Sequence, residues 1–145
     1  MAKVIAVNIS EKKGVIKHPI EKGFFKINHG LEGDAHAGNW HRQVSFLGTE
    51  SIEKMKASGV EGLCSGKFAE NITTEGIVLY ELPVGTKFKI GEVTFEVTQI
   101  GKECHLGCEI RHLVGDCVMP REGIFAKVLA EGYVKPGDEI VILEV

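Results

Sequence analysis

Cysteines and basic residues gather in one short segment of the chain. Cys104 and Cys108 are separated by three residues, and Lys102, His105 and Arg111 lie close to them in sequence. Positive charge beside a thiol favours the thiolate, which is the form that acts as a nucleophile or binds a soft metal. Cys104 also follows the clearest predicted strand, at a loop position where functional residues are common. Cys104 is therefore the first candidate for a catalytic or metal-ligating residue.

A structural zinc site is an alternative use of the same segment. Cys104, Cys108 and His112 all carry side chains that bind zinc. Structural zinc sites usually contain two close ligand pairs, such as Cys-x2-Cys twice, whereas only one pair is close here. Ordinary burial is the simpler interpretation of Cys108 and Cys117, and no role is assigned to Cys64.

A glycine-rich loop carries the second group of polar residues. Residues 33–36 read Gly-Asp-Ala-His, and residues 41–44 read His-Arg-Gln-Val. A carboxylate, two imidazoles and a guanidinium in one loop can bind an anion or order a binding site. The alternative is that Asp34 caps a turn and that Arg42 is solvated or forms a structural ion pair.

An adjacent carboxylate and amide form the third group. Residues 66–73 read Gly-Lys-Phe-Ala-Glu-Asn-Ile-Thr, so that Glu70 and Asn71 stand between apolar residues. Asn71 can offer its amide to a ligand, because an amide both donates and accepts hydrogen bonds. The alternative is that both side chains satisfy backbone groups at a bend, and the sequence leaves the two interpretations open.

The elements that position these residues are predicted to be short strands separated by glycine turns. Strands are expected at residues 3–9, 43–47, 85–91, 92–100 and 140–145, with a hairpin turn at Gly91-Glu92 and a second turn at residues 136–138. Two short helices are expected, one from an N-cap at Thr49 to Gly59 and one at residues 124–130 that Gly132 ends. This pattern predicts a mostly-β (α+β) fold, a barrel or sandwich with short helical insertions.

Composition limits the classes of protein that remain. The chain has 145 residues, 43% hydrophobic and 26% charged, which predicts a single globular domain over residues 1–145. A net charge of -3 argues against a nucleic-acid partner or a polybasic membrane surface. No apolar run approaches the roughly 18 residues of a membrane span, and the N-terminus does not read as a signal peptide. We therefore expect a cytoplasmic protein, whose four cysteines are buried, reactive or metal-bound rather than paired in disulfides.

Four motifs, taken in their order along the chain, resemble the MOSC domain, the C-terminal module of eukaryotic molybdenum cofactor sulfurases. They are Gly33-Asp34-Ala35-His36, Arg42-Gln43-Val44, residues 66–72 and Gly101-Lys102-Glu103-Cys104. Their order and spacing match from about residue 20 to the end. Residues 117–125 are similar to the compact stand-alone bacterial branch of the family. The resemblance implies a MOSC-type β-barrel.

The resemblance also implies molybdenum cofactor (molybdopterin) chemistry centred on Cys104. In relatives that hold the cofactor, such as the mitochondrial amidoxime-reducing component, the matching cysteine ligates molybdenum and the asparagine matching Asn71 lies near the pterin. In the sulfurases the domain binds cofactor and receives sulfur. We therefore expect Cys104 as the catalytic and metal-ligating residue, and His36, Arg42, Asn71 and Lys102 as cofactor-binding residues. Arg42 is the best candidate for the pterin's phosphate, because a planar guanidinium matches phosphate oxygens.

Three functions are consistent with these residues. The first is a module that binds molybdenum cofactor or its precursor, transiently or permanently, with Cys104 as metal ligand or persulfide carrier. Its partners would be a sulfur donor such as a cysteine desulfurase, or a molybdoenzyme acceptor. The second is a small molybdenum-dependent reductase of N-hydroxylated compounds with an external electron donor. The third is a zinc- or thiol-based structural module. Whether the chain is an enzyme stays open at this stage.

Overall fold

A computed structural model describes residues 2–10, 17–35, 37–40, 42–50, 53, 70–100 and 123–144 of the chain. These residues are mostly β, which confirms the predicted class. The strands are β1 (Lys3–Ile9), β2 (His18–Ile20), β3 (Gly23–Lys26), β4 (Gly30–Leu31), β5 (Val44–Gly48), β6 (Ile72–Glu75), β7 (Lys87–Ile90), β8 (Val93–Ile100), β9 (Ile124–Ala130), β10 (Gly132–Val134) and β11 (Ile140–Glu144). A single 3-10 turn, η1 (Leu79–Glu81), follows β6 among the described residues.

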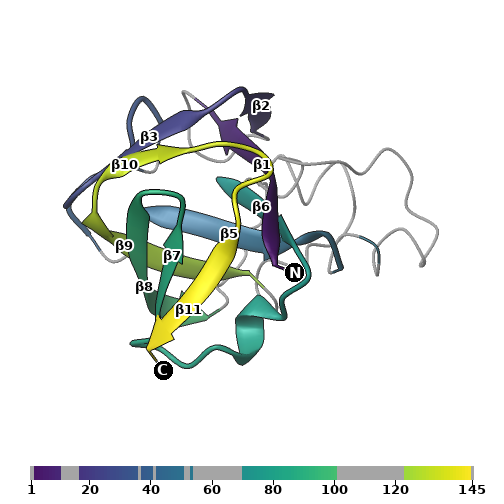
Figure 1. The fold of residues 1–145 in the computed structure, drawn as a ribbon. Coiled ribbons are helices and arrows are strands. Elements are labelled where there is room, and N and C mark those ends of the chain that lie inside the picture. The colour runs from purple at the N-terminus through teal and green to yellow at the C-terminus, as the bar shows by residue number, and fades with distance from the viewer. Residues whose placement is uncertain are drawn as a thin grey trace, which may run out of the picture.

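The strands form two sheets in the described part of the chain (Figure 1). The larger has eight strands in the order β11-β7-β8-β9-β5-β6-β1-β2, and the smaller has the order β10-β3-β4. Among the described strands, β5 and β6 alone pair in parallel, and the other pairs are antiparallel. Because β5 and β6 are parallel, the segments that lead into them, which are distant in the sequence, lie at the same end of the two strands.

The large sheet curls but is not a closed barrel in the described residues. An isolated antiparallel bridge joins Lys3 to Glu139, and backbone N–H groups of Val4 and Ile140 donate to carbonyls of the facing segment at 2.8 and 2.9 Å. These contacts bring β1 beside the residues that lead into β11. No ladder of paired strands joins the two edge strands of the described sheet, so the expected barrel is not confirmed.

Most of the predicted strands are confirmed. Residues 3–9 form β1, residues 44–48 form β5, one position later than expected, and residues 93–100 form β8. The hairpin turn between β7 and β8 lies at Gly91, whose φ of 58° is in the left-handed region that favours glycine. The closing strand is β11.

The prediction of a helix at residues 124–130 is wrong. These residues form β9, which lies between β5 and β8 near the centre of the sheet. The first three residues of β9 are all buried, so alternation is lost there and the apolar run cannot be distinguished from a buried helix by periodicity. Gly132 ends no helix but begins β10, where a Cβ would lie 2.7 Å from Cβ of Glu92.

Only part of the other predicted helix falls within the described residues. Thr49, Glu50 and Glu53 are helical, and the remainder of the segment to Gly59 lies outside the described residues. No helix in the described part of the chain is long and apolar enough to cross a membrane.

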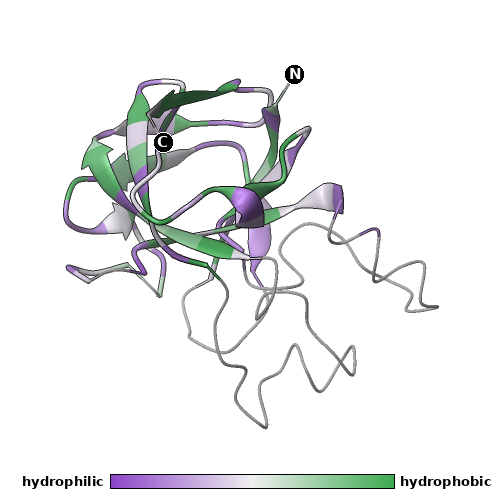
Figure 2. Cartoon of the chain, turned by 90° about the horizontal axis from the view of Figure 1, so that it is seen from below, coloured by the Kyte–Doolittle hydropathy of each residue, from purple (hydrophilic) through white to green (hydrophobic). Residues whose placement is uncertain are grey.

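Aromatic rings fill the space that the strands surround. Phe46 of β5 packs edge-on against Phe88 and Phe95, at ring-centroid distances of 5.3 and 5.2 Å, and all three are fully buried. Phe25 of the small sheet packs against Phe95 at 5.6 Å. Figure 2 shows the apolar strands arranged around this core. Because β5, β7 and β8 share these rings, their relative positions are set by close packing.

Candidate functional site

Four residues form a row across neighbouring strands of the large sheet. Gln99 of β8 lies opposite Phe125 of β9, and Phe125 lies opposite Ser45 of β5. Asn71, just before β6, continues the row, because its backbone N–H donates to the Ser45 carbonyl at 2.9 Å. The row therefore brings together the end of β8 and the segments that carry two of the predicted site residues, Arg42 and Asn71.

Arg42 lies over this row and is held on two sides. Its Nε donates to Oε1 of Gln99 at 3.1 Å. Its guanidinium carbon lies 5.4 Å from the ring centroid of Phe125 and 5.9 Å from that of Trp40. None of the ion pairs in the described part of the chain includes Arg42. The alternative of a structural ion pair therefore finds no support among these residues.

Gln43 anchors the chain next to Arg42. Its side chain is buried, and its Oε1 accepts a hydrogen bond from the backbone N–H of Val128 at 3.0 Å. This bond links the start of β5 to β9. Gln43 is therefore buried at the start of β5, whereas Arg42 beside it is only partly buried.

The Asn71 side chain is fully buried and bonded within the protein. Its Oδ1 accepts from the N–H of Ser45 at 3.0 Å and from the Ser45 hydroxyl at 3.2 Å. Its Nδ2 donates to the carbonyl of Asn8 at 3.3 Å. Asn71 thus satisfies backbone groups at a bend, as one of the two sequence interpretations proposed, and it joins β1 to β5.

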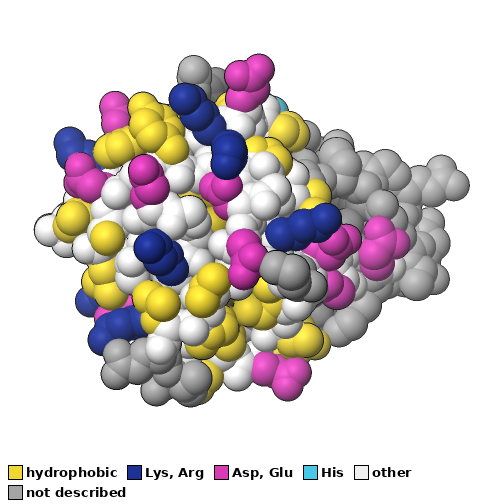
Figure 3. Space-filling view, in the orientation of Figure 1, with side chains coloured by type: hydrophobic (Ala, Val, Ile, Leu, Met, Phe, Trp, Pro, Cys, Tyr) yellow, Lys and Arg dark blue, Asp and Glu magenta, His cyan; other side chains and the backbone are white. Residues whose placement is uncertain are grey.

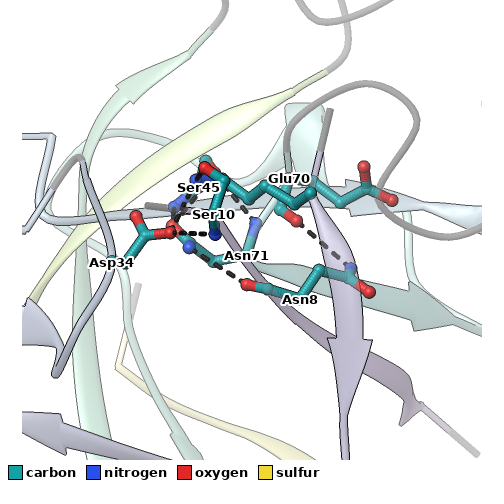
Figure 4. A network of polar contacts seen from close by, with 7 residues as sticks. Asn8, Ser10, Asp34, Ser45, Glu70 and Asn71 are labelled. Carbon is teal, nitrogen blue, oxygen red and sulfur yellow. Dashed lines mark hydrogen bonds and ion pairs between the residues drawn. The ribbon is translucent and has the colours of Figure 1, made fainter. Parts of the chain in front are cut away.

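Asp34 and Lys17 form a buried ion pair, and Figure 4 shows Asp34 beside Asn71. Lys17 Nζ lies 2.7 Å from Oδ1 of Asp34, and both side chains have no exposed surface. The N–H of Ser10 also donates to Asp34 Oδ1, at 3.0 Å, and Lys17 Nζ donates to the Ser10 hydroxyl at 3.1 Å. Asp34 therefore acts as a structural anchor between its loop and β1, rather than simply as a turn cap.

The electrostatics of Asp34 follow from these contacts. Burial by itself raises the pKa of the carboxyl. The charge of Lys17, together with hydrogen bonds from Lys17, Ser10 and Asn71, outweighs burial and holds the pKa below its ordinary value of 3.8. Asp34 is therefore a carboxylate at neutral pH.

Glu70 and Asn8 extend the polar network along β1 and β6. Oε2 of Glu70 accepts from the Thr73 hydroxyl at 2.7 Å. Nδ2 of Asn8 donates to the Glu70 carbonyl at 3.2 Å and to Thr73 Oγ1 at 3.0 Å. Oδ1 of Asn8 is buried and has no hydrogen-bond partner in the described structure. Figure 4 shows Asn8 and Glu70 near Asn71, and Asn8 bonds to both of them, so Glu70 belongs to the same network as the predicted site residue.

Several predicted site residues lie outside the described residues. They are His36, Lys102 and Cys104, together with the other cysteines and His112. His36 stands between Ala35 and Ala37, which are both placed. The N–H of Ala35 donates to the Ser10 carbonyl at 2.8 Å, and that of Ala37 donates to the Asp34 carbonyl at 3.2 Å. The Asp34 anchor thus orders the backbone on both sides of His36.

The described residues contain no group of three or more His, Cys, Asp or Glu side chains suited to a metal ion. The described residues instead offer a hydrogen-bond donor that suits the phosphate of molybdenum cofactor. A phosphate fits the guanidinium of Arg42, which has no acidic partner in this part of the chain. The expected soft ligand, the thiolate of Cys104, lies outside it.

Sequence reasoning missed Lys17, Gln99 and Asn8 as members of this region. Lys17 and Asn8 carry no recognisable motif. Glu96 and Thr98 occupy the polar positions of the alternating strand, and Gln99 is a polar residue at a position where the alternation calls for an apolar one. Register shifts between β8 and β9 change the face there. That loss of alternation is the one signal in the sequence that could have drawn attention to Gln99.

The same fold occurs in solved bacterial structures. YuaD from Bacillus subtilis superimposes with a TM-score of 0.82 at 19% identity, covering 100% of this chain and 97% of that one. YiiM from Geobacillus stearothermophilus gives a TM-score of 0.74 at 18% identity, covering 99% and 76%. YiiM from Escherichia coli gives 0.73 at 18%, covering 100% and 71%. At these identities the similarity shows a shared fold.

No curated protein sequence matches the chain. The model of the MOSC domain family matches residues 33–141, a segment that includes the Asp34 loop, Arg42, Asn71 and Cys104. The matched segment is most of the sequence and begins one residue before the Asp34 anchor. The chain therefore belongs to the MOSC domain family.

Proposed function

We propose that this protein binds molybdenum cofactor or its precursor and uses Cys104 as a metal ligand or as a carrier of sulfur. The observation that carries the proposal is the guanidinium of Arg42, held by Gln99 at the end of β8 with no acidic partner in the described residues. Membership of the MOSC family supports the choice of cofactor.

Chain geometry supports the pairing of Arg42 with Cys104. β8 ends at Ile100, the residue after Gln99, and Cys104 follows four residues later. Four residues span at most about 14 Å. This spacing supports one site of the size of a pterin cofactor, in which Arg42 would bind an anionic group and Cys104 a ligand atom.

Each of the other predicted residues has a role in this proposal. Arg42 binds the phosphate, and Lys102 adds positive charge near the thiol, which favours the thiolate. Asn71 orders the neighbouring strands through its bonds to Ser45 and Asn8. His36 would bind the cofactor as well, and Asp34, two residues before it in the sequence, is anchored by Lys17. The cofactor, when bound, supplies the redox chemistry of its metal.

The sulfur-carrier role needs no external oxidant. The Cys104 thiolate attacks the outer sulfur of a persulfide on a donor protein such as a cysteine desulfurase. The donor's S–S bond breaks, its cysteine leaves as a thiolate, and Cys104 keeps the transferred sulfur as a persulfide. A cysteine thiolate of a molybdoenzyme acceptor would then attack that outer sulfur, the S–S bond of the Cys104 persulfide would break, and Cys104 would leave as a thiolate. This chemistry requires a reducing compartment, so we propose a cytoplasmic location.

Elemental analysis tests the proposal. Wild type, Cys104→Ala and the matched control Cys108→Ala are purified anaerobically from a host that makes the cofactor, and molybdenum, tungsten, zinc and pterin fluorescence are measured. We expect molybdenum and pterin in wild type and Cys108→Ala and their loss in Cys104→Ala. Stoichiometric zinc that both variants lose would overturn the proposal in favour of a zinc module.

A sulfur-transfer assay covers transient carriage. Apoprotein is incubated with a cysteine desulfurase and cysteine, and intact mass and tryptic peptides are recorded. We expect one added sulfur atom on Cys104 in wild type and none in Cys104→Ala. Absence of molybdenum, pterin and added sulfur in wild type would contradict both forms of the proposal. Reduction of an N-hydroxylated compound by loaded protein with an electron donor would instead indicate an enzyme.

A further inference from the structure

Arg42 is oriented by a neutral side chain. The bond from its Nε to Gln99 Oε1, 3.1 Å long, fixes one edge of the guanidinium, and the Phe125 ring at 5.4 Å supports one face. Gln99 and Phe125 are directly opposite each other on β8 and β9. Both supports therefore come from adjacent positions in a paired sheet, which is a rigid base for a flexible side chain.

The charge of Arg42 is left uncompensated by this arrangement. The side chain is partly buried, and no carboxylate in the described residues pairs with it. Partial burial of a charge is unfavourable unless a counter-charge or hydrogen bonds accompany it. The aromatic faces of Phe125 and Trp40 offset part of that cost. An anionic ligand would offset the rest.

The choice of an amide at position 99 matters for this reason. A carboxylate there would accept the same hydrogen bond and would also neutralise the guanidinium. The amide oxygen of Gln99 orients the fork and keeps its full charge for a ligand. With Nε engaged, the two terminal nitrogens remain to form the parallel hydrogen bonds that a phosphate accepts.

We propose that Gln99 is a positioning residue that presents Arg42 to the phosphate of the ligand, and that the Arg42–Gln99 pair selects ligands carrying a phosphate ester. This inference deepens the proposed function and rests on its assignment of Arg42. The pair would discriminate a phosphorylated pterin from the same ring without phosphate.

The single tryptophan of the chain provides a local signal for binding. Trp40 is 36% exposed, and its ring lies 5.9 Å from the Arg42 guanidinium. A pterin that binds beside Arg42 therefore quenches Trp40 fluorescence. The probes are 6-hydroxymethylpterin phosphate and unphosphorylated 6-hydroxymethylpterin, titrated into wild type, Arg42→Ala, Gln99→Leu and Gln99→Glu.

Lys127→Met is the matched control. Lys127 lies two residues from Phe125 on β9, and its Nζ is 3.9 Å from Glu96, so the variant removes a nearby positive charge without touching Arg42. In wild type and Lys127→Met we expect a lower dissociation constant for the phosphorylated pterin than for the unphosphorylated pterin. Gln99→Glu and Gln99→Leu should each raise the dissociation constant of the phosphate ester by roughly tenfold. The rise should be larger in Gln99→Glu, because the carboxylate also neutralises the guanidinium. Binding of the unphosphorylated ring should not change, which a general loss of folding would not produce.

The outcomes separate this inference from the proposed function. Loss of phosphate-dependent binding in Arg42→Ala, with both Gln99 variants equal to wild type, overturns the role of Gln99 and leaves Arg42 in place. Equal affinity of wild type for the two probes overturns Arg42 as a phosphate site and the role of Gln99 with it. Cofactor or sulfur on Cys104 is measured independently and decides the proposed function.

Discussion

Lys17 and Asp34, seventeen residues apart in sequence, form an ion pair with 2.7 Å between Nζ and Oδ1 and with no exposed side-chain surface. The pair ties the loop that contains His36 to the end of β1, because Ser10 contacts both partners. The order of this part of the proposed site therefore depends on a charge pair that lies beneath it.

Removing one partner of the pair should be strongly destabilising. Lys17→Met leaves the Asp34 carboxylate buried without its counter-charge, and we expect a loss of about 3–5 kcal/mol in the free energy of unfolding. The double variant Lys17→Met/Asp34→Leu should recover much of that loss, since no charge then remains buried. Urea unfolding of the two variants and wild type measures the difference. Equal stability of Lys17→Met and wild type would contradict the buried pair.

The pair also predicts how stability responds to acid. The folded pKa of Asp34 lies below 3.8, so the unfolded state binds the proton more tightly. The contribution of Asp34 is therefore present above pH 3.8 and is lost as the pH falls through the lower folded value. In Lys17→Met the charge that lowers the pKa is gone and burial raises it, so protonation of Asp34 now favours the folded state. The loss of stability caused by Lys17→Met, relative to wild type, should therefore shrink as the pH falls. Unfolding free energies of both proteins measured from pH 7 down to pH 3 test this, and a difference that stays constant or grows with acid would contradict it.

Asn71 should be important for stability as well as for the site. Asn71→Leu removes the acceptor of Ser45 N–H and Oγ and the donor to the Asn8 carbonyl. We expect a cost of about 3 kcal/mol, because each buried group left without a partner is penalised. Ser45→Ala removes one hydroxyl and should cost about 1 kcal/mol. Denaturant unfolding compares the two, and a smaller effect in Asn71→Leu than in Ser45→Ala would show that the amide is replaceable.

The aromatic core should respond to loss of a single ring. Phe46→Ala removes the ring that contacts both Phe88 and Phe95, and we expect a cost of about 3–5 kcal/mol. Val84, 61% exposed, offers a control, since Val84→Ala should change stability by no more than about 0.5 kcal/mol. Thermal melting and urea unfolding check both variants, and similar values for the two would refute the packing described for β5.

The face shown in Figure 3 carries no broad patch of one charge sign among the described residues. Basic and acidic side chains of the described residues are interspersed over that face. Local groupings, such as the guanidinium of Arg42 beside Trp40, therefore matter more for ligand binding than a broad field of one sign.

Local patterns in the sequence were enough to predict the half-buried strands. Short motifs were enough to indicate the family. β8 was predictable because one face of it meets the core and the other faces outward, which produces alternation. The Gly91 hairpin was predictable because a positive φ favours glycine. The motifs around Asp34, Arg42, Asn71 and Cys104 indicate the MOSC family, whose model matches residues 33–141.

The tertiary structure alone decided β9 and the contacts of the site residues. Residues 124–130 pair with β5 and β8 inside the sheet, and the first three of them are all buried, so the start of this apolar run has no period that separates strand from helix. Arg42 meets Gln99 across 57 residues, and Asn71 meets Ser45 across 26. Such partners are chosen by strand order and register, which depend on the packing of the whole sheet and are not encoded in any short segment.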